Sequence, residues 1–403
     1  MKYIIILGDG MADWADAFDG QTVLQHARKP YMDKLAKEGR TGMVCTVPEG
    51  FTPGSEVANM GVLGYDVHKV FEGRGVLEAA NIGVDLKDGD MGMRCNLICV
   101  ENGCIKNHSA GHLTTEEGRE LIQYLDRELG SDKVQFHPGI QYRHLLVVNG
   151  GCKELVCTPP HDVPGQPFEP LMIKAATAQA QPTADLLNSL ILRSQELLAK
   201  HPINLARKAQ GKDMANSIWP WSPGYRPQMA TLAQSFPQIK KSAVISAVDL
   251  IKGIGKYAGM EVIDVEGATG LFDTNYENKT RAAIDALRTC DLVYVHVEAA
   301  DEAGHEGNRE LKLRCVEDLD SRLIGPIYEE IRNWDEPVCI AVLPDHPTPC
   351  SHRTHTRENV PFLIWHRGIE PDKVQQYDEK SCLDGAYGTL EDGTGFIKVL
   401  LKS

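Results

Sequence analysis

Four unbroken apolar runs constrain the fold of this 403-residue chain more than any other feature. They are "YIIIL" at 3–7, "AVISAV" at 243–248, "LVYVHV" at 292–297 and "VCIAVL" at 338–343. Runs of this length without polar alternation are typical of strands buried on both faces, which occur mainly in parallel sheets. Helical patterns such as "RKPYMDKLAKEG" separate them. The sequence therefore predicts an α/β fold with a mostly parallel sheet covered by helices.

The middle of the chain has a different pattern. Hairpin-like pairs such as "GMRCNLICVENGCIKN" and an amphipathic helix in "TADLLNSLILRSQELLAKH" replace the buried runs there. Because buried runs occur only near the two ends of the chain, we expect residues 81–238 to form an inserted, smaller α+β domain. Residues 1–80 and 239–403 would then build one discontinuous parent domain.

Composition and charge exclude several classes of function. The formal net charge of −14 and the lack of a basic run of five or more residues argue against nucleic acid, which needs clustered Lys and Arg. No stretch approaches the roughly 18 apolar residues of a membrane span. The first apolar run is too short for a signal peptide. The eleven scattered cysteines suit a reduced, cytoplasmic protein. An oligomeric state is not indicated.

Three acidic residues follow three of the predicted strands. They are Asp9 after "YIIILG", Asp301 after "VYVHVEAA" and Asp345 after "CIAVLP". In open α/β sheets, sites assemble at the carboxyl ends of strands, so these residues can converge although they lie far apart in sequence. Unpartnered carboxylates held a few ångströms apart would raise one another's pKa. A divalent ion is the usual means of keeping them ionised.

Histidines accompany these acids. "DEAGH" places His305 four residues after the second acid, "DH" places His346 directly after the third, and "HRTH" offers His352 and His355. Taken singly, each of these is more often an ordinary surface or core residue than a ligand. Together they supply about six oxygen and nitrogen donors without a thiolate, which suits two ions such as Mn²⁺, Mg²⁺ or Zn²⁺. The joint pattern predicts a site for two metal ions.

Two-metal sites commonly serve transfer at phosphorus, which requires a nucleophile. Ser55 in "PGSEVANMGVLG" is the candidate, because a turn at Pro53 and Gly54 leads into a helix that starts at the serine. A hydroxyl there lies at the helix N-terminus and can be ionised by a coordinated metal. An ordinary helix-capping serine is the alternative interpretation of this segment. "GRGVLEAANIGV" lacks the Lys-Ser/Thr of a nucleotide-binding loop.

Six motifs together resemble a known family. They are "ILGDGMAD", "PGSEVANMGVLGYD", "GRGVLEAANIG", "DEAGHEGN", "LPDH" and "THTRENVPF". Their order and spacing over nearly the whole chain are similar to the cofactor-independent phosphoglycerate mutases of the archaeal type, members of the alkaline phosphatase superfamily. The resemblance implies a phosphatase-like metal domain interrupted by a phosphotransferase-like substrate domain. It also implies interconversion of 2- and 3-phosphoglycerate through a phosphoserine, without 2,3-bisphosphoglycerate.

The resemblance also implies roles for the site residues. Ser55 resembles the nucleophile. One metal would be held by Asp9, Ser55, Asp345 and His346, and the other by Asp301, His305 and His355. Mn²⁺ is the expected ion, with Mg²⁺, Zn²⁺ and Co²⁺ as alternatives. His355 is preferred to His352 because "HTRENVPF" is similar to the family's His-Thr followed by a proline-containing strand.

A small anionic, phosphorylated substrate needs a cationic pocket in this acidic chain. The candidates for that pocket are Arg74, His108, Arg143, Arg207 and Lys256, with Arg226 as a further basic residue. A solvated surface position is the alternative for each. Asp162 is the candidate general acid or base.

One departure from the family keeps other functions open. His112 stands where the family's pattern leads us to expect Arg. This leaves open phosphoryl transfer to a small alcohol such as homoserine. A metal-dependent phosphatase and a catalytically silent metal-binding protein are further alternatives.

Overall fold

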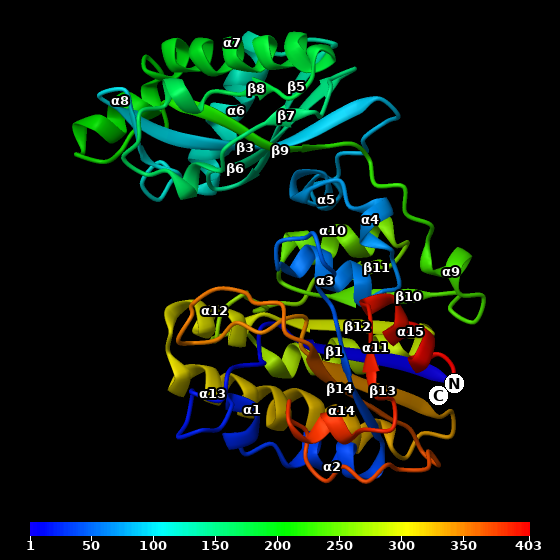
Figure 1. The fold of residues 1–403 in the computed structure, drawn as a ribbon. Helices are drawn as coiled ribbons and strands as arrows, with labels where there is room; N and C mark the ends of the chain where they lie inside the picture. The colour runs from blue at the N-terminus through cyan, green and yellow to red at the C-terminus, as the bar shows by residue number, and fades with distance from the viewer. The chain divides into compact units, whose positions relative to one another are not determined.

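The protein is described here by a computed structural model that covers residues 1–403, and it divides into two compact units. Unit 1 comprises Met1–Phe71 and Gln228–Ser403, and unit 2 comprises Glu72–Pro227. Figure 1 shows both units with their helices and strands labelled. Each unit has a sheet and an apolar core of its own.

Unit 1 is built on an eight-stranded sheet. Its strands are β1 (Lys2–Gly8), β2 (Arg40–Val44), β10 (Ser242–Ile245), β11 (Glu261–Ile263), β12 (Leu292–Val297), β13 (Val338–Leu343), β14 (Val360–Trp365) and β15 (Thr389–Leu390). They lie in the order β11-β10-β12-β1-β13-β14-β2-β15. β14 runs antiparallel to both of its neighbours, whereas the other pairings are parallel. Three of the four apolar runs lie on parallel strands over their whole length, and the run 243–248 begins on the parallel strand β10, which ends at Ile245. The predicted fold class is confirmed.

Helices cover both faces of this sheet (Figure 1). They are α1 (Val23–His26), α2 (Pro30–Glu38), α3 (Ser55–Val62), α4 (Val67–Val70), α9 (Leu232–Ser235), α10 (Asp249–Tyr257), α11 (Tyr276–Thr289), α12 (Ala299–Glu306), α13 (Arg309–Asp318), α14 (Gly325–Ile331) and α15 (Gly393–Leu400). Ile4 and Ile6 of β1 pack with apolar residues of α2, α11, α13 and α14. The alternate residues Ile5 and Leu7 point to the opposite face, and they are also fully buried. Burial on both faces explains the unbroken apolar runs.

Unit 2 has an antiparallel sheet with helices packed on it. Its strands are β3 (Asp90–Glu101), β4 (Cys104–Asn107), β5 (Val134–Ile140), β6 (Arg143–Asn149) and β9 (Ser217–Gly224), with a separate pair, β7 (Leu155–Val156) and β8 (Lys174–Ala175). Its α-helices are α5 (Arg74–Asn81), α6 (Thr115–Leu129), α7 (Gln181–Leu198) and α8 (Pro202–Ala209). The predicted hairpin is present as β3 and β4, which are joined through Asn102 and Gly103, both at positive φ. A two-residue turn of this kind matches the twist of the flanking strands.

The sequence analysis placed the two boundaries between the units after residues 80 and 238. The structure places them earlier in the chain, after Phe71 and Pro227. α5 belongs to unit 2 because it packs against β3 and β9. A Cβ added to Gly75 would lie 2.7 Å from the β3 backbone, which leaves no room for a side chain there. α9 belongs to unit 1, where Leu232 N donates to the Ala258 carbonyl at 2.9 Å. The strand β9 that α5 contacts lies far from it in sequence, so composition does not mark the boundaries.

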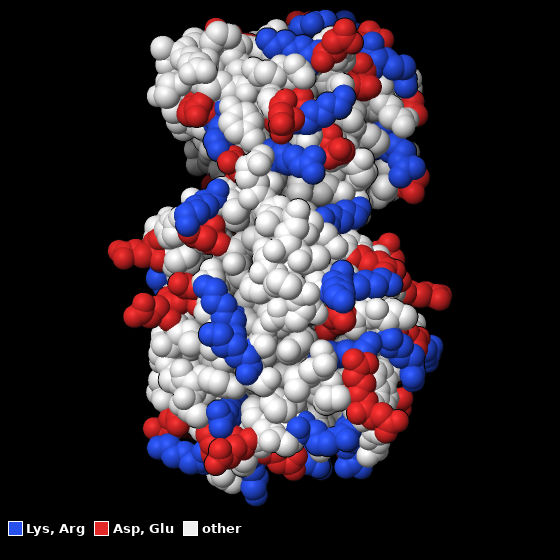
Figure 2. All heavy atoms as spheres, turned by 90° about the vertical axis from the view of Figure 1, so that its right-hand side faces the viewer, with Lys and Arg blue, Asp and Glu red and all other residues white.

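Charged side chains of both signs are interspersed on the face that Figure 2 shows. None of the helices has the length and apolar character that crossing a membrane would require.

A buried carboxylate anchors the start of α2. Asp320 lies in the π-helical segment η4 (Leu319–Ile324) and is fully buried. It accepts the backbone N–H groups of Met32 at 2.7 Å and Tyr31 at 3.2 Å. Burial raises the pKa of Asp320 to about 6, against a smaller lowering by these two N–H groups. The folded chain therefore keeps this proton to a higher pH than the unfolded chain does.

We predict a stability change with pH that depends on Asp320. An unfolded Asp loses its proton near pH 4, so the free energy of unfolding should fall as pH rises from about 4 to about 6. The fall for this one group is at most about 1.4 kcal/mol per pH unit. Asp320→Asn should lack this fall. The stability of the variant relative to the wild type should therefore increase as pH rises across this window. Urea denaturation at several pH values measures the difference, and a constant difference would contradict the prediction.

Candidate active site

The segments that follow β1, β12 and β13 bring the predicted ligands together at the carboxyl ends of these strands, and α12 after β12 carries Asp301 and His305. Donor atoms of Asp9, Asp345 and His346 lie within 4.8 Å of one another, as do those of Asp301, His346 and His355. His346 belongs to both groups, so the two groups are adjacent. The three aspartates are buried, at most 4% exposed. Residues from opposite ends of the chain therefore form one cluster.

The first group is centred on Asp345. Its Oδ1 accepts the backbone N–H groups of Gly10 at 3.1 Å and His346 at 2.9 Å, so one carboxylate joins the loops after β1 and β13. His346 Nε2 lies 3.5 Å from Asp345 Oδ2 and 3.7 Å from Asp9 Oδ1. Burial, and then the charges of Asp345 and Asp301, raise the pKa of Asp9 well above its usual range. Asp9 Oδ1 is buried and has no hydrogen-bond donor, which leaves it available to a cation.

The second group is centred on Asp301. Nε2 of His305 lies 3.2 Å from Asp301 Oδ2, and Nε2 of His355 lies 3.3 Å from Oδ1. The two Nε2 atoms are 3.0 Å apart. The Nδ1 atoms face the carbonyl oxygens of Arg353 and Pro53, which places a proton on each Nδ1. Both Nε2 atoms then face each other and a carboxylate, as imidazole ligands of a metal do.

The pKa values in this second group reflect strong coupling between its members. The hydrogen bond with Asp301 raises the pKa of His305 to about 9. Burial would raise the pKa of Asp301, but hydrogen bonds with His305 and His355 lower it well below its usual range. A divalent cation would take the place of these protons, since a metal binds the carboxylate and the neutral imidazole.

Ser55 is the first residue of α3 and lies beside the first group. Its Oγ is 3.2 Å from His346 Nε2 and 3.5 Å from Asp9 Oδ2. The preceding residue, Gly54, is the N-cap and offers no side chain to the free N–H groups of the helix. The positive end of the helix dipole therefore acts on Ser55 and favours the ionised form of its hydroxyl.

The donors fit two divalent cations. They comprise carboxylate and hydroxyl oxygens and imidazole nitrogens without a thiolate, the set that suits Mn²⁺, Mg²⁺ and Zn²⁺. The orphaned Asp9 oxygen and the two facing imidazole nitrogens are atoms that a cation would satisfy. The assignment of individual ligands stays a prediction.

Known proteins match this chain over its full length. A family model described as 2,3-bisphosphoglycerate-independent phosphoglycerate mutase matches residues 36–204. The protein with that name from Methanosarcina mazei is 50% identical over 406 residues, which is 100% of each chain. The chain belongs to this mutase family. A probable member from Geobacter sulfurreducens is 45% identical, again over 100% of both chains. The family resemblance carried by the six motifs is therefore confirmed.

Solved structures of similar proteins agree with the fold. A protein from Pyrococcus horikoshii matches with a TM-score of 0.84 and 28% identity, covering 100% of this chain and 96% of that one. The cofactor-independent phosphoglycerate mutase from Thermoplasma acidophilum matches with a TM-score of 0.71 and 25% identity, covering 100% and 99%. The Thermoplasma acidophilum mutase thus shares this architecture over its whole length.

Two residues at the site were not predicted from the sequence. His296 Nε2 lies 3.0 Å from Asp9 Oδ2, and Glu298 lies within 4.8 Å of Asp9 and Asp301 through its carboxylate. Burial lowers the pKa of His296 to about 4, and burial raises that of Glu298 to about 8, with Asp301 adding to the rise. His296 lies inside the apolar run of β12, and Glu298 directly follows it. The strand-end rule that selected Asp301 would also have selected Glu298.

Unit 2 contains a group of arginines around Arg94. The Arg94 guanidinium lies 4.6 Å from the centre of the Trp221 ring, and its Nε is 3.2 Å from Glu78. Burial lowers the pKa of Arg94, Glu78 opposes this, and the nearby charges of Arg74 and Arg143 lower it further. Two of the predicted substrate residues therefore lie near a third arginine that the sequence analysis missed. The sequence feature that could have indicated Arg94 is a lone cationic residue inside the apolar strand "GMRCNLICV".

His108 lies near this group. Its ring centre is 5.6 Å from that of Tyr142, whose ring Arg143 covers at 5.7 Å. It is also 6.1 Å from the ring of His161. Burial, and then the charge of His161, lower the pKa of His108, so the ring is neutral near pH 7. A neutral imidazole can donate to or accept from a substrate hydroxyl.

The structure contradicts the prediction that Arg207 binds substrate. Arg207 is only 3% exposed. Its guanidinium contacts Glu117 Oε2 at 2.7 Å and the carbonyl oxygens of Ala110, Gly111 and Asp213 at 2.8 Å each. These partners use its N–H groups on several sides, so no face remains for an anion. Arg207 instead ties α8 to the loop that contains Ala110.

The remaining predicted residues lie on the surfaces of their units. Lys256 is exposed on α10 of unit 1, and α10 packs against α3. Asp162 is exposed in the short segment η1 (Pro160–Asp162) of unit 2, 3.5 Å from His161. Arg226 donates to Asp85 at 2.8 Å. The roles of Lys256 and Asp162 stay predictions.

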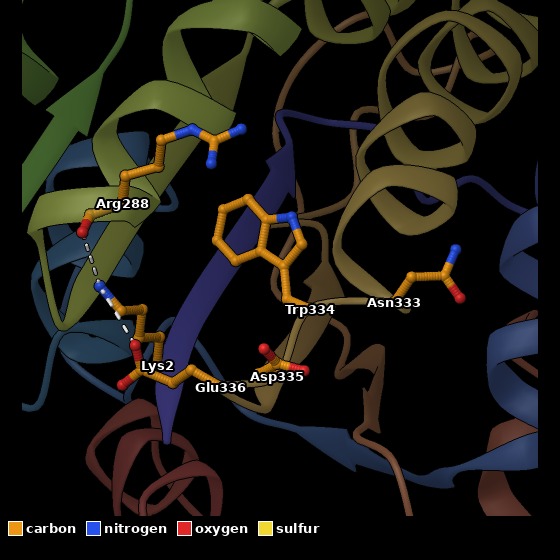
Figure 3. Close-up of a pocket in the computed structure, with 6 residues that line it drawn as sticks. All are labelled: Lys2, Arg288, Asn333, Trp334, Asp335 and Glu336. Atoms are coloured by element: carbon orange, nitrogen blue, oxygen red, sulfur yellow. Dashed lines mark hydrogen bonds and ion pairs between the residues drawn. The ribbon is translucent and has the colours of Figure 1, made fainter.

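A pocket of about 430 Å³ lies elsewhere on unit 1 (Figure 3). It is lined by Lys2, Arg288, Asn333, Trp334, Asp335 and Glu336. Lys2 begins β1 and Glu336 precedes β13, so this pocket lies at the amino ends of the strands whose carboxyl ends carry the cluster. Lys2 Nζ donates to the carbonyl oxygens of Leu287 at 2.6 Å and Arg288 at 3.1 Å. This pocket is therefore separate from the candidate active site.

His355 and His352 offer a matched test of the second metal group. His355 lies with Asp301, whereas His352 is exposed and its ring lies 5.3 Å from that of Trp14. His355→Ala should weaken Mn²⁺ binding by about 10-fold or more, because it removes a ligand. His352→Ala should bind Mn²⁺ as the wild type does. Calorimetric titration of metal-free protein measures both, and the opposite order would show that the ligand was assigned incorrectly.

Proposed function

We propose that this chain interconverts 2-phosphoglycerate and 3-phosphoglycerate through a phosphoserine at Ser55. The observation that carries the proposal is the position of Ser55 Oγ at the start of α3, 3.2 Å from His346 and 3.5 Å from Asp9. The names of the full-length relatives support the same reaction. They also describe an enzyme that works without 2,3-bisphosphoglycerate.

Two divalent ions would complete the site, with Mn²⁺ as the expected ion and Mg²⁺, Zn²⁺ or Co²⁺ as alternatives. Asp9, Ser55, Asp345 and His346 would hold one ion, and Asp301, His305 and His355 the other. When bound, the ions supply the positive charge that keeps the carboxylates ionised and lowers the pKa of a neighbouring hydroxyl.

The chain's own residues have distinct tasks in this reaction. Ser55 Oγ forms a bond to phosphorus while the bond from phosphorus to one glycerate oxygen breaks. The other glycerate hydroxyl then takes the phosphoryl group from Ser55, and the proton it loses balances the one that the first oxygen gained. The dipole of α3 favours the serine alkoxide in the first step.

The basic residues of unit 2 would bind the anionic substrate. Arg74 and Arg143 lie close enough to Arg94 to lower its pKa, so positive charge is concentrated there although the chain as a whole is acidic. Arginine suits a carboxylate because its N–H groups match the two oxygens. We propose that this group, with His108, binds the carboxylate and hydroxyls of glycerate. Retention of glycerate matters because water competes as the acceptor of the phosphoryl group.

Phosphoryl transfer to homoserine and simple hydrolysis are less well supported, because the full-length relatives are named as mutases. We also propose a cytoplasmic location. All eleven cysteines are unpaired, which supports a reducing compartment.

A coupled assay tests the reaction directly. Purified protein with Mn²⁺ and 3-phosphoglycerate should form 2-phosphoglycerate, which enolase converts to a product that absorbs ultraviolet light. No 2,3-bisphosphoglycerate should be needed. Parallel reactions contain homoserine with a phosphoryl donor. Absence of isomerisation with all four ions would refute the proposal, and release of inorganic phosphate in its place would favour a phosphatase.

Replacement of the nucleophile tests the covalent step. Ser55→Ala should lower turnover by roughly 10³-fold or more, because no alternative nucleophile occupies its position. Metal content should stay close to that of the wild type, and the Ser55 peptide of the wild type should be phosphorylated after an acid quench. Ser351→Ala, at an exposed serine, is the matched control and should retain activity. Activity in Ser55→Ala would rule out the phosphoserine.

A further inference from the structure

A buried amide connects the nucleophile's helix to a predicted metal ligand. Asn59 lies one helical turn after Ser55 on α3 and is fully buried. Its Nδ2 donates to the Ser55 carbonyl oxygen at 2.8 Å and to Asp345 Oδ2 at 3.0 Å. The other oxygen of Asp345, Oδ1, accepts two backbone N–H groups. Asn59 thus supplies a side-chain donor to Oδ2, which these backbone groups do not contact.

Tyr294 determines which end of this amide faces Asp345. Tyr294 is fully buried on β12, and its hydroxyl donates to Asn59 Oδ1. Burial, and then the charges of Asp345 and Asp9, raise the pKa of Tyr294 well above its usual range, so the phenol keeps its proton. The oxygen and nitrogen ends of an amide are alike in shape, and hydrogen bonding decides which way the group points. With Oδ1 held by Tyr294, the NH₂ end must face Asp345 and Ser55.

We propose that Tyr294 and Asn59 are positioning residues for the metal site and the nucleophile. The Tyr294 hydroxyl orients the Asn59 amide. The amide in turn fixes the rotation of the Asp345 carboxylate and the position of the first turn of α3. This inference rests on the proposed function, because it takes Asp345 as a metal ligand and Ser55 as the nucleophile.

The neutrality of this pair suits its location. A lysine in place of Asn59 would compete with a metal ion for Asp345, whereas an amide gives an N–H bond without a formal charge. A reversed amide would place Oδ1 against Asp345 Oδ2, and two acceptors at this distance in a buried site repel each other. Loss of the Tyr294 hydroxyl should therefore affect the metal site although Tyr294 is not itself a ligand.

Tyr294→Phe tests the orienting step. The ring remains while the donor to Asn59 Oδ1 is lost, so only Asp345 and the Ser55 carbonyl oxygen still hold the amide, and its rotation is less tightly fixed. Mn²⁺ affinity at one site should fall by about 10- to 100-fold, the usual cost of losing a partner of a metal ligand. Activity should fall at low Mn²⁺ and recover at saturating Mn²⁺. Calorimetric titration and the rate of Ser55 phosphorylation at several Mn²⁺ concentrations measure these effects.

Asn59→Asp tests the second step. It keeps the acceptor for Tyr294 and the shape of the side chain but replaces the NH₂ group that Asp345 uses. We expect a larger loss of Mn²⁺ affinity than in Tyr294→Phe. Circular dichroism shows whether each variant is folded, and Tyr294→Phe alone decides the outcome if Asn59→Asp does not fold.

Tyr377→Phe is the matched control. Tyr377 is also fully buried in unit 1, but its hydroxyl donates to the Pro361 carbonyl oxygen at 2.8 Å, away from the cluster. This variant should lose thermal stability yet bind Mn²⁺ within about twofold of the wild type. An equal loss of Mn²⁺ affinity in Tyr377→Phe, or unchanged affinity in Tyr294→Phe, would overturn the proposal.

The proposed function and the positioning role fail in different ways. Wild-type protein that binds Mn²⁺ but does not isomerise phosphoglycerate would refute the mutase reaction, while the Mn²⁺ affinities of the variants would still test the positioning role. Wild-type protein that isomerises phosphoglycerate while Tyr294→Phe matches it at every Mn²⁺ concentration would refute only the positioning role. Wild-type protein that binds no divalent ion would refute both.

Discussion

Repulsion between buried carboxylates at one edge of the large sheet is the constraint on which the rest of the structure depends. Asp9, Asp301 and Asp345 are nearly inaccessible to water, and uncompensated charge in such a place costs several kcal/mol per ion. Backbone N–H groups, the Asn59 amide and imidazoles surround these acids. These neighbours come from different strands, loops and helices. The strands that carry the acids must therefore keep a fixed register for each carboxylate to meet its partners.

Charge is distributed unevenly between parts of the chain that have different tasks. The whole chain is acidic, yet Arg74 and Arg143 both lie near Arg94 in unit 2. Net charge therefore describes the average surface and not the local field that an anionic substrate meets. The aromatic rings of Tyr142 and Trp221 lie under two of these guanidinium groups and help to hold them in place.

The sequence was informative wherever a single physical requirement dominates. Burial on both faces requires unbroken apolar strands, and the carboxyl ends of such strands then located Asp9, Asp301 and Asp345. It was less informative where a role depends on partners. In the sequence, Arg207 cannot be distinguished from a surface cation. Only the structure shows that Glu117 and three carbonyl oxygens surround it. The first unit boundary was placed too late for the same reason, because β9, which α5 contacts, lies far from it in sequence.

The wide sequence separation of the clustered residues has a consequence for biosynthesis. Asp9 leaves the ribosome first among them, and His355 follows only after most of the chain has been made. Parallel strands of such high contact order pair late, so the nascent protein passes through a long interval with an incomplete set of donors. The complete set of donors for a metal is therefore available only after most of the polypeptide has been made.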